Sequence, residues 1–576
     1  MDRSANAKKR LEKRRMVMRN RRKRPIIKTH KKLSDMIADK KSGESSSLQT
    51  KSVASEVQIR AFNDKQQPVK VGELSPALHI NVDRIKHRLG NPTDLIVREF
   101  EFELEQKVTA TLIFLEEMND TQLLSEFILE PLMNLTSEKQ SSPVPINHAL
   151  HYIKQNALAL GRVLDVETED ELLEALLAGL SVLLVEGNTK GLKMGTNGGK
   201  MRNIEEPTSE VVIRGPKEAF TESIKTNISL IRRKLRSPDL RIEKFIVGDI
   251  TRTDLAIVYM DNIVNPLIVK EIKERIEQVK TDGLLETGQL EEFIQDETVT
   301  VFPQLMSTER PDVVIGNILE GRVGIIVNGT PFSLIAPTQF IQFFQSSEDY
   351  YMRYDISTFL RLLRFSVFII SLIAPSIYIA LTTFHQAMIP TTLLFGIAAQ
   401  REGVPFPAIA EALVMEITFE ILREAGIRMP RAVGVAVSIV GALVLGQAAV
   451  QAGLVSPAMV IVVGITAVAS FAIPSFAVAT SARLLRFPLM IISSVFGFYG
   501  LTLALIVIVA HLTSLRSFGI PYLSPFAPIQ TQDLKDSLFR FPVTHLFKRP
   551  EKLAKKNATR TLPYEVKKKR EEETTR

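Results

Sequence analysis

The stretch RAVGVAVSIVGALVLGQAAVQAGLVSPAMVIVVGITAVASFAIPSFAVATSAR, which runs from Arg431 to Arg483, decides the fold of this chain. Between the two arginines there is no Asp, Glu, Lys, Arg or His. At a rise of about 1.5 Å per residue, the run is too long for one crossing of a bilayer core about 30 Å thick and suits two. Residues 452–457, AGLVSP, combine a helix-ending glycine with a Ser-Pro helix start. The stretch therefore predicts a pair of membrane-spanning helices.

Two more charge-free runs flank this pair, Phe365–Phe384 and Phe487–Ala510, and each is about long enough to span once. Residues 356–515 are therefore predicted to form a polytopic α-helical membrane domain with four to five helices. Residues 406–427, which carry several glutamates, are either a further span or a helix that does not cross.

Basic residues beside the spans indicate the orientation, because Lys and Arg favour the cytoplasmic side. Arg361 and Arg364 place the preceding region inside, and the basic tail, residues 516–576, is also predicted to be cytoplasmic. An N-terminal region and a tail on one side require an even number of crossings. Arg428 and Arg431 also favour the inside, which adds a fifth crossing, so four and five both stay open.

The composition excludes several chemistries. The chain has 576 residues, 24% of them charged, and no cysteine, so disulfides, thiolate catalysis and Cys-ligated metals are excluded. Its eight histidines show no metal-ligand spacing. The glycine-rich loop at residues 190–200 does not fit a phosphate-binding loop, because Met194 and Met201 stand where Gly and Ser or Thr are required. No catalytic, cofactor-binding or metal-binding residues are predicted, and the chain is not predicted to be an enzyme.

Residues 1–70 are predicted to be a basic disordered arm and linker, with KKR at residues 8–10 and RRKR at residues 21–24. A basic arm beside a bilayer binds anionic lipid headgroups. No aromatic residues interleave with its charges, so lipid is favoured over nucleic acid.

Residues 71–355 alternate short apolar strands with amphipathic helices, which indicates an α+β cytoplasmic region. An internal repeat runs through it: IKHRL at residues 85–89 recurs as IRRKL at residues 231–235, and TLIFLE at 111–116 as AIVYMD at 256–261. The repeat predicts two related subdomains, residues 71–150 and 151–355, each built on a helix, strand, strand, helix unit.

Several longer motifs, in the same order along the chain, resemble the A subunits of the spore-germination receptors, the GerA family. The motifs are RNIEEP at 202–207, EVVIRGP at 210–216, QREGVPFP at 400–407, ITFEILRE at 417–424 and IVGAL at 439–443. The resemblance covers roughly residues 75–550. It implies an inner spore membrane protein that works with a permease-like B subunit and a lipoprotein C subunit, and that forms homo-oligomeric channels which release ions when a nutrient is sensed. The related SpoVAF-like proteins share much of the pattern.

A stripe of acidic residues follows the Pro405-Phe406-Pro407 motif. Successive helical residues turn by about 100°, so Glu416, Glu420 and Glu424 share one side of a helix. The functional interpretation is an acidic vestibule that attracts cations. The alternative is an interfacial helix in which Glu420 pairs with Arg423, and Glu424 with Arg428, at helical spacing.

The next helix has two contrasting faces. Small residues, suited to close helix packing, recur at every fourth position at Gly434, Ser438, Ala442 and Gly446. Nearly opposite lie the candidate pore-lining residues Val437, Val440, Val444, Gln447 and Gln451. An apolar ring with a polar end fits a pore that gates by dewetting. Ordinary helix packing, with the glutamines bonded to a neighbour, is the alternative.

These features predict the A subunit of a nutrient-responsive germinant receptor, forming an oligomeric ion-conducting channel. A secondary transporter is a second class, although such carriers show paired membrane halves and no membrane repeat is visible here. A non-conducting scaffold subunit and a SpoVAF-like accessory channel are further alternatives. The sequence does not identify the nutrient.

Overall fold

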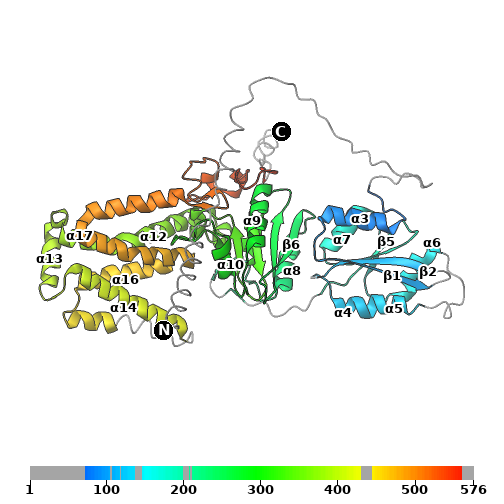
Figure 1. The fold of residues 1–576 in the computed structure, drawn as a ribbon, viewed down its shortest axis with the longest axis horizontal. Coiled ribbons are helices and arrows are strands. Elements are labelled where there is room, and N and C mark those ends of the chain that lie inside the picture. Colours follow the sequence, from blue (N-terminus) through cyan, green and yellow to red (C-terminus); the bar gives the residue numbers. More distant parts are fainter. Residues whose placement is uncertain are drawn as a thin grey trace, which may run out of the picture. The chain divides into compact units, whose positions relative to one another are not determined.

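The computed structural model describes residues 72–103, 107–116, 118–135, 146–198, 206–207, 210–429 and 444–560. The predicted basic arm therefore lies outside the described residues, as do residues 561–576 of the tail. The described chain consists of two sheet-containing subdomains followed by long helices (Figure 1).

The first subdomain is an antiparallel sheet with strand order β1-β2-β4-β5-β3 and helices between its strands. Thr168 begins α7 by accepting a hydrogen bond from the Glu171 amide, which is the usual role of an N-cap threonine. The elements are α3 (Leu78–Leu89), β1 (Leu95–Glu103), β2 (Lys107–Leu115), α4 (Thr121–Leu124), a π-helical turn (Ser125–Leu129), α5 (Glu130–Met133), α6 (Ile146–Tyr152), a second π-helical turn (Ile153–Ala157), β3 (Val163–Val166), α7 (Glu169–Leu177), β4 (Ser181–Val185) and β5 (Gly191–Met194).

The second subdomain is an antiparallel sheet with strand order β6-β7-β9-β10-β8. Its elements are α8 (Ile224–Lys234), β6 (Leu240–Val247), β7 (Thr253–Met260), α9 (Pro266–Gln278), α10 (Thr287–Ile294), β8 (Met306–Thr308), α11 (Pro311–Ile318), β9 (Val323–Val327) and β10 (Ser333–Ala336), followed by 3-10 turns at Phe340–Phe344 and Ser347–Tyr350.

The two sheets have the same strand order, and the sequence repeat coincides with this structural repeat. IKHRL and IRRKL end α3 and α8, while TLIFLE and AIVYMD lie in β2 and β7. The predicted boundary at residue 150 differs from the structure, because β3, β4 and β5 belong to the first sheet. The shared helix, strand, strand, helix unit is only the first half of each copy. The boundary at residue 150 therefore places the second half of the first copy, with β3, β4 and β5, in the wrong subdomain.

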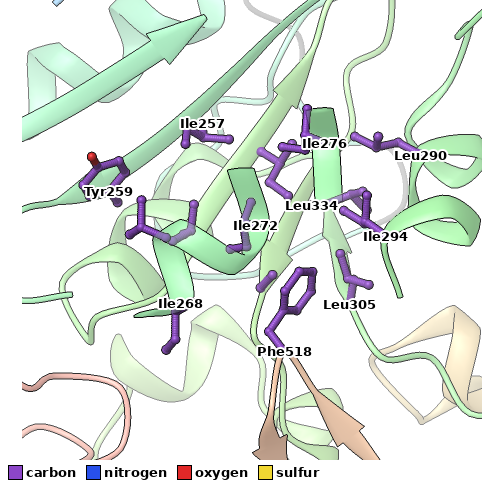
Figure 2. Packing of buried hydrophobic residues seen from close by; sticks show 14 of the residues in the cluster. Ile257, Tyr259, Ile268, Ile272, Ile276, Leu290, Ile294, Leu305, Leu334 and Phe518 are labelled. Carbon is purple, nitrogen blue, oxygen red and sulfur yellow. The ribbon is translucent and has the colours of Figure 1, made fainter. Parts of the chain in front are cut away.

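The second sheet is buried on both faces. Successive strand residues point to opposite sides of a sheet, so each strand contributes side chains to both faces. In β7, Leu255, Ile257 and Tyr259 pack into one apolar cluster, and the residues between them pack into another. Figure 2 shows the first cluster, in which Ile268, Ile272 and Ile276 of α9 lie over the sheet and Phe518 enters from a distant part of the chain.

Phe518 belongs to the segment that follows the long helices. This segment begins with the short strands β11 (Arg516–Ser517) and β12 (Ile520–Pro521), and Leu553 packs into the same cluster as Phe518. The Asn265 amide donates to the Leu553 carbonyl at 2.9 Å. Phe518, Ile520 and Leu553 of the predicted tail therefore belong to the core of the second subdomain.

The helical part contains α12 (Tyr354–Thr383), α13 (Thr391–Arg401), α14 (Ala408–Arg428), α16 (Pro457–Phe471) and α17 (Phe476–Ser514), with residues 444–451 also helical. Within the described residues, α12 and α17 are the two helices long and apolar enough to cross a membrane by length and composition.

Candidate functional site: the helical bundle

Contacts with the second subdomain distinguish the two ends of the helical bundle. At one end, which we call the domain end, Ser481 Oγ donates to the Val301 carbonyl, and the His511 Nε2 lies 2.9 Å from the Thr300 Oγ1. At the other, the far end, the His385 ring that follows α12 lies against Gly497. These contacts give each helix a direction.

α17 reverses its direction at Gly497. Ser481 and His511 are 30 residues apart, roughly 45 Å along a straight helix, yet they contact the neighbouring residues Val301 and Thr300. Gly497 has φ 58° and ψ −145°, a conformation that a side chain disfavours, and a Cβ there would lie 2.7 Å from the His385 ring. α17 is therefore two antiparallel arms, residues 476–496 and 498–514.

The other helices also connect the two ends. α12 starts at the domain end and finishes at Phe384, beside Gly497. Ala408 of α14 and Met459 of α16 pack with Tyr378, near the far end of α12. Both helices then run back, because α14 reaches Arg483 through Glu420 and α16 ends at a cavity shared with the second subdomain.

The junction between the second subdomain and α12 is centred on Asp349, whose side chain is fully buried. Arg361 Nε donates to one oxygen of Asp349 at 3.0 Å, and Arg364 donates to the other at 2.7 Å. Arg361 also donates to Asp536, in the returning tail, at 2.9 Å. The bundle, the second subdomain and the tail are thus linked by charge-assisted hydrogen bonds at one point.

Glu416 of the predicted acidic stripe is buried between helices. Its carboxylate accepts from Arg486 at 2.6 Å, and both side chains are 1% exposed. The same guanidinium donates to the carbonyl and the hydroxyl of Ser371 in α12, at 2.7 and 2.8 Å. This network therefore joins α12, α14 and α17.

The other two glutamates of the stripe are also paired with arginines. Glu420 accepts from Arg423 at 2.7 Å and lies 3.4 Å from Arg483, while Glu424 accepts from Arg428 at 2.6 Å. The pairs at helical spacing are those that the interfacial-helix alternative expects. An acidic vestibule at these positions would require the pairs to open, so the vestibule stays a prediction.

Sequence reasoning missed the arginine partners of the buried glutamates. Arg486 lies 70 residues from Glu416, and Arg401 donates to the fully buried Glu411 at 3.3 Å. A signal was available in the sequence, because arginines stand at the ends of the apolar runs. A buried glutamate requires a partner, and these arginines carry the opposite charge. Among the described residues, no group of His, Asp and Glu could hold a metal ion.

Four of the predicted packing and pore-lining residues lie in the described part of their helix. Gly446 is buried, and a Cβ on it would lie 3.5 Å from Val460 of α16. Val444 is 55% exposed, and Gln447 and Gln451 are exposed as well. Outside the described residues lie Gly434, Val437, Ser438, Val440 and Ala442.

Comparison with known proteins agrees with the resemblance seen in the motifs. The family model of the Bacillus/Clostridium GerA spore germination protein matches residues 83–552. The chain is 50% identical over 497 residues to spore germination protein KA of Bacillus subtilis (strain 168), covering 86% of this chain and 90% of that protein. It is 38% identical to spore germination protein GerLA of Bacillus cereus, covering 85% of this chain and 98% of that protein.

Two further proteins are similar to this chain. The membrane protein YfkQ of Bacillus subtilis (strain 168) is 41% identical, covering 83% of this chain and 91% of that protein. A crystal structure of the N-terminal domain of the A subunit of the Bacillus megaterium spore germinant receptor GerK3 is 36% identical, covering 47% of this chain and 99% of that one, with a TM-score of 0.38.

The chain has a sheet-rich N-terminal region and a helical C-terminal part, and the proteins it is similar to are spore germination proteins. The family match covers most of the chain, and so does the similarity to protein KA. The chain belongs to the GerA family, as an A subunit of the germination receptors.

Proposed function

We propose that this A subunit assembles with further copies of itself into an ion-conducting membrane channel, which opens to release ions and start germination. The observation that supports it is the exposed face of Val444, Gln447 and Gln451, opposite the buried Gly446. Amide side chains facing lipid cost free energy unless they find a partner or water. Several copies of the chain arranged around a pore would give the glutamines both a partner and water, and Val444 would form a hydrophobic constriction in that pore.

We further propose that the chain crosses the membrane six times. The count is α12, α14, the span that the sequence predicts between Arg431 and Gly453, α16, and the two arms of α17. Residues 516–560 pack on the second subdomain, so the number of crossings is even, and the reversal at Gly497 supplies the crossing that the sequence did not reveal. Arg428 and Arg483 then lie at the domain end, as cytoplasmic arginines do.

The family also supports a proposal for the setting. We place the channel in the inner spore membrane, with the sheet-containing region and the tail in the cytoplasm and the basic arm near lipid headgroups. A permease-like B subunit and a lipoprotein C subunit complete the receptor, and the B subunit binds the nutrient. The role of the A subunit is non-catalytic, and nucleic acid is not among its ligands.

Val444→Ala tests the pore. Removing two methyl groups from a hydrophobic constriction favours its hydration, so the variant should leak ions and germinate without nutrient. Val495→Ala is the matched control, because Val495 of α17 is 56% exposed, like Val444, and lies outside the proposed pore face. Ion retention of dormant spores is the measurement.

Normal ion retention and germination in the Val444→Ala spores would contradict the pore assignment. If that variant is lost from the membrane, counting protomers of the detergent-solubilised wild-type complex decides instead. A monomer would overturn the channel, and a symmetric ring that passes no ions in planar bilayers would indicate a scaffold subunit.

A further inference from the structure

A cavity of about 640 Å³ lies where the second subdomain meets the turn between α16 and α17. Its wall includes Glu210, Glu291 and Leu305 from the subdomain and Ile473 and Phe476 from the turn. This volume is within the range of sites for small organic ligands. The residues that close it come from both the soluble part and the bundle.

The cavity contains more negative than positive charge. Of its four carboxylates, two are matched: Asp312 accepts from Arg310 at 2.9 Å, and Glu320 accepts from Arg560 at 2.9 Å. Glu210 and Glu291 form no ion pair with any basic group among the described residues. The Glu210 carboxylate accepts from the Thr308 hydroxyl at 2.6 Å, and its backbone carbonyl accepts from Arg310 at 3.2 Å.

Burial raises the pKa of both unpaired carboxyls to about 7. A carboxylate that loses water without gaining a cation is destabilised, so a bound cation would recover free energy at both positions. A cationic ligand would supply the positive charge that the protein does not place beside these two carboxylates.

The remaining wall is apolar and aromatic. Phe343, Phe476 and Tyr350 line it together with Leu305 and Val212. Aromatic faces attract organic cations and also accommodate an apolar body. A bare metal ion fits less well, because no cluster of three ligating side chains was found in the part of the chain that the structure describes.

We propose that this cavity binds a small organic cation, with its positive nitrogen at Glu210 or Glu291 and its apolar part against Phe343 and Phe476. Binding would join the second subdomain to the turn between α16 and α17. This inference goes beyond the proposed channel, and its test does not require conduction.

The chain has no cysteine, so single cysteines report on this cavity without background. Gly316 lines the cavity, and a Cβ on it would meet nothing within 4 Å, so Gly316→Cys places a thiol there. Gly161→Cys, exposed and equally free of contacts, is the matched surface control. The measurement is the rate at which a trimethylammonium methanethiosulfonate and a sulfonate methanethiosulfonate modify each full-length variant.

The ratio of the cationic to the anionic rate should be about tenfold higher at Gly316→Cys than at Gly161→Cys, because the cavity concentrates cations. Adding Glu210→Gln and Glu291→Gln should remove most of this preference. Phenethylammonium should slow the modification, whereas the neutral 2-phenylethanol should not.

Equal rate ratios at the two cysteines would overturn the proposal, as would a preference that survives both Gln substitutions. If Gly316→Cys does not fold, Ser475→Cys on the bundle side of the same cavity gives an independent measurement with the same expected outcomes. Protection by both phenethylammonium and 2-phenylethanol would also overturn it, since the charge would then play no part.

Discussion

The first subdomain closes its apolar clusters with its own residues, between Leu74 and Met194, whereas the second takes Phe518, Ile520 and Leu553 from beyond the bundle. The two sheets have the same strand order, so the two subdomains differ in what packs on the sheet and not in the sheet itself. In the second copy, the chain that follows the helical bundle packs on the sheet and so joins the sheet to the bundle.

The second subdomain also makes the contacts that join the parts of the chain. It meets the first subdomain through Arg232, which donates to Asp94, and it meets the bundle through Val301 and the Asp349 junction. We infer that the first copy is a self-contained unit and that the second joins the sheet-containing part to the helices. The following predictions test that contrast, from the largest expected effect to the smallest.

Phe518→Ala should destabilise the second subdomain and leave the first unchanged. The ring is 4% exposed, and the Arg275 guanidinium lies 4.5 Å from its centroid. Phe→Ala in a core costs about 3–5 kcal/mol in the free energy of unfolding. Hydrogen exchange resolved by region should show lost protection in β6, β7 and β9.

Phe114→Ala is the matched control, since Phe114 is 8% exposed in the core of the first subdomain. Its effect should stay within β1, β2 and β4. Equal loss of protection in both sheets from either substitution would show that the subdomains unfold together, and the contrast between them would fail.

Arg232→Met tests the joint between the two copies. Arg232 Nη2 donates to one oxygen of Asp94 at 2.8 Å and its Nε to the other at 2.5 Å, and both side chains are at most 1% exposed. Removing the arginine leaves a buried carboxylate without a partner, which costs about 3–5 kcal/mol. Denaturant unfolding of the full chain should shift accordingly.

The double substitution Arg232→Met with Asp94→Leu should cost much less, because no charge is then left unpaired. A cost equal to that of Arg232→Met alone would mean that lost packing, and not the unpaired charge, explains the effect.

The sequence predicted much of this fold because its signals are local. Charge-free runs coincide with much of α12 and with α16, and the repeated IKHRL and IRRKL segments with the ends of α3 and α8. The run Phe487–Ala510 was wrongly predicted to span once, because it contains the reversal at Gly497. The boundary at residue 150 was wrong because β3, β4 and β5 carry no recognisable repeat, and their place depends on long-range strand pairing. The reversal at Gly497 lies inside a charge-free run, where periodicity shows nothing.

The candidate site was harder to predict, because many of its contacts join residues that are distant in sequence. Helical spacing was enough to expect Glu420 with Arg423 and Glu424 with Arg428. The partner of Glu416 is on another helix, and only the packing of α14 against α17 brings Arg486 to it. The cavity at Glu210 also requires two parts of the chain that are distant in sequence.

Glu210 and Glu291 should give the second subdomain a pH dependence. Burial raises the pKa of both carboxyls from 4.5 to about 7, with Asp312 and Glu309 adding to the effect at Glu210 and Arg310 opposing it, and with Glu286 and Glu292 adding to it at Glu291. The folded state therefore binds more protons than the unfolded state between these values. The stabilisation is complete below about pH 4.5 and is lost as the pH rises through 7.

The loss should be on the order of 3 kcal/mol for each group, since the pKa rises from 4.5 to about 7 and one pKa unit corresponds to about 1.4 kcal/mol. Hydrogen exchange of the second sheet, corrected for the intrinsic effect of pH, should show weaker protection at pH 8 than at pH 5. Glu210→Gln with Glu291→Gln should flatten this difference, because an amide is neutral at both pH values. If the double variant keeps the full difference, the titrating groups lie elsewhere, and the contrast between the subdomains does not depend on the charge of the cavity.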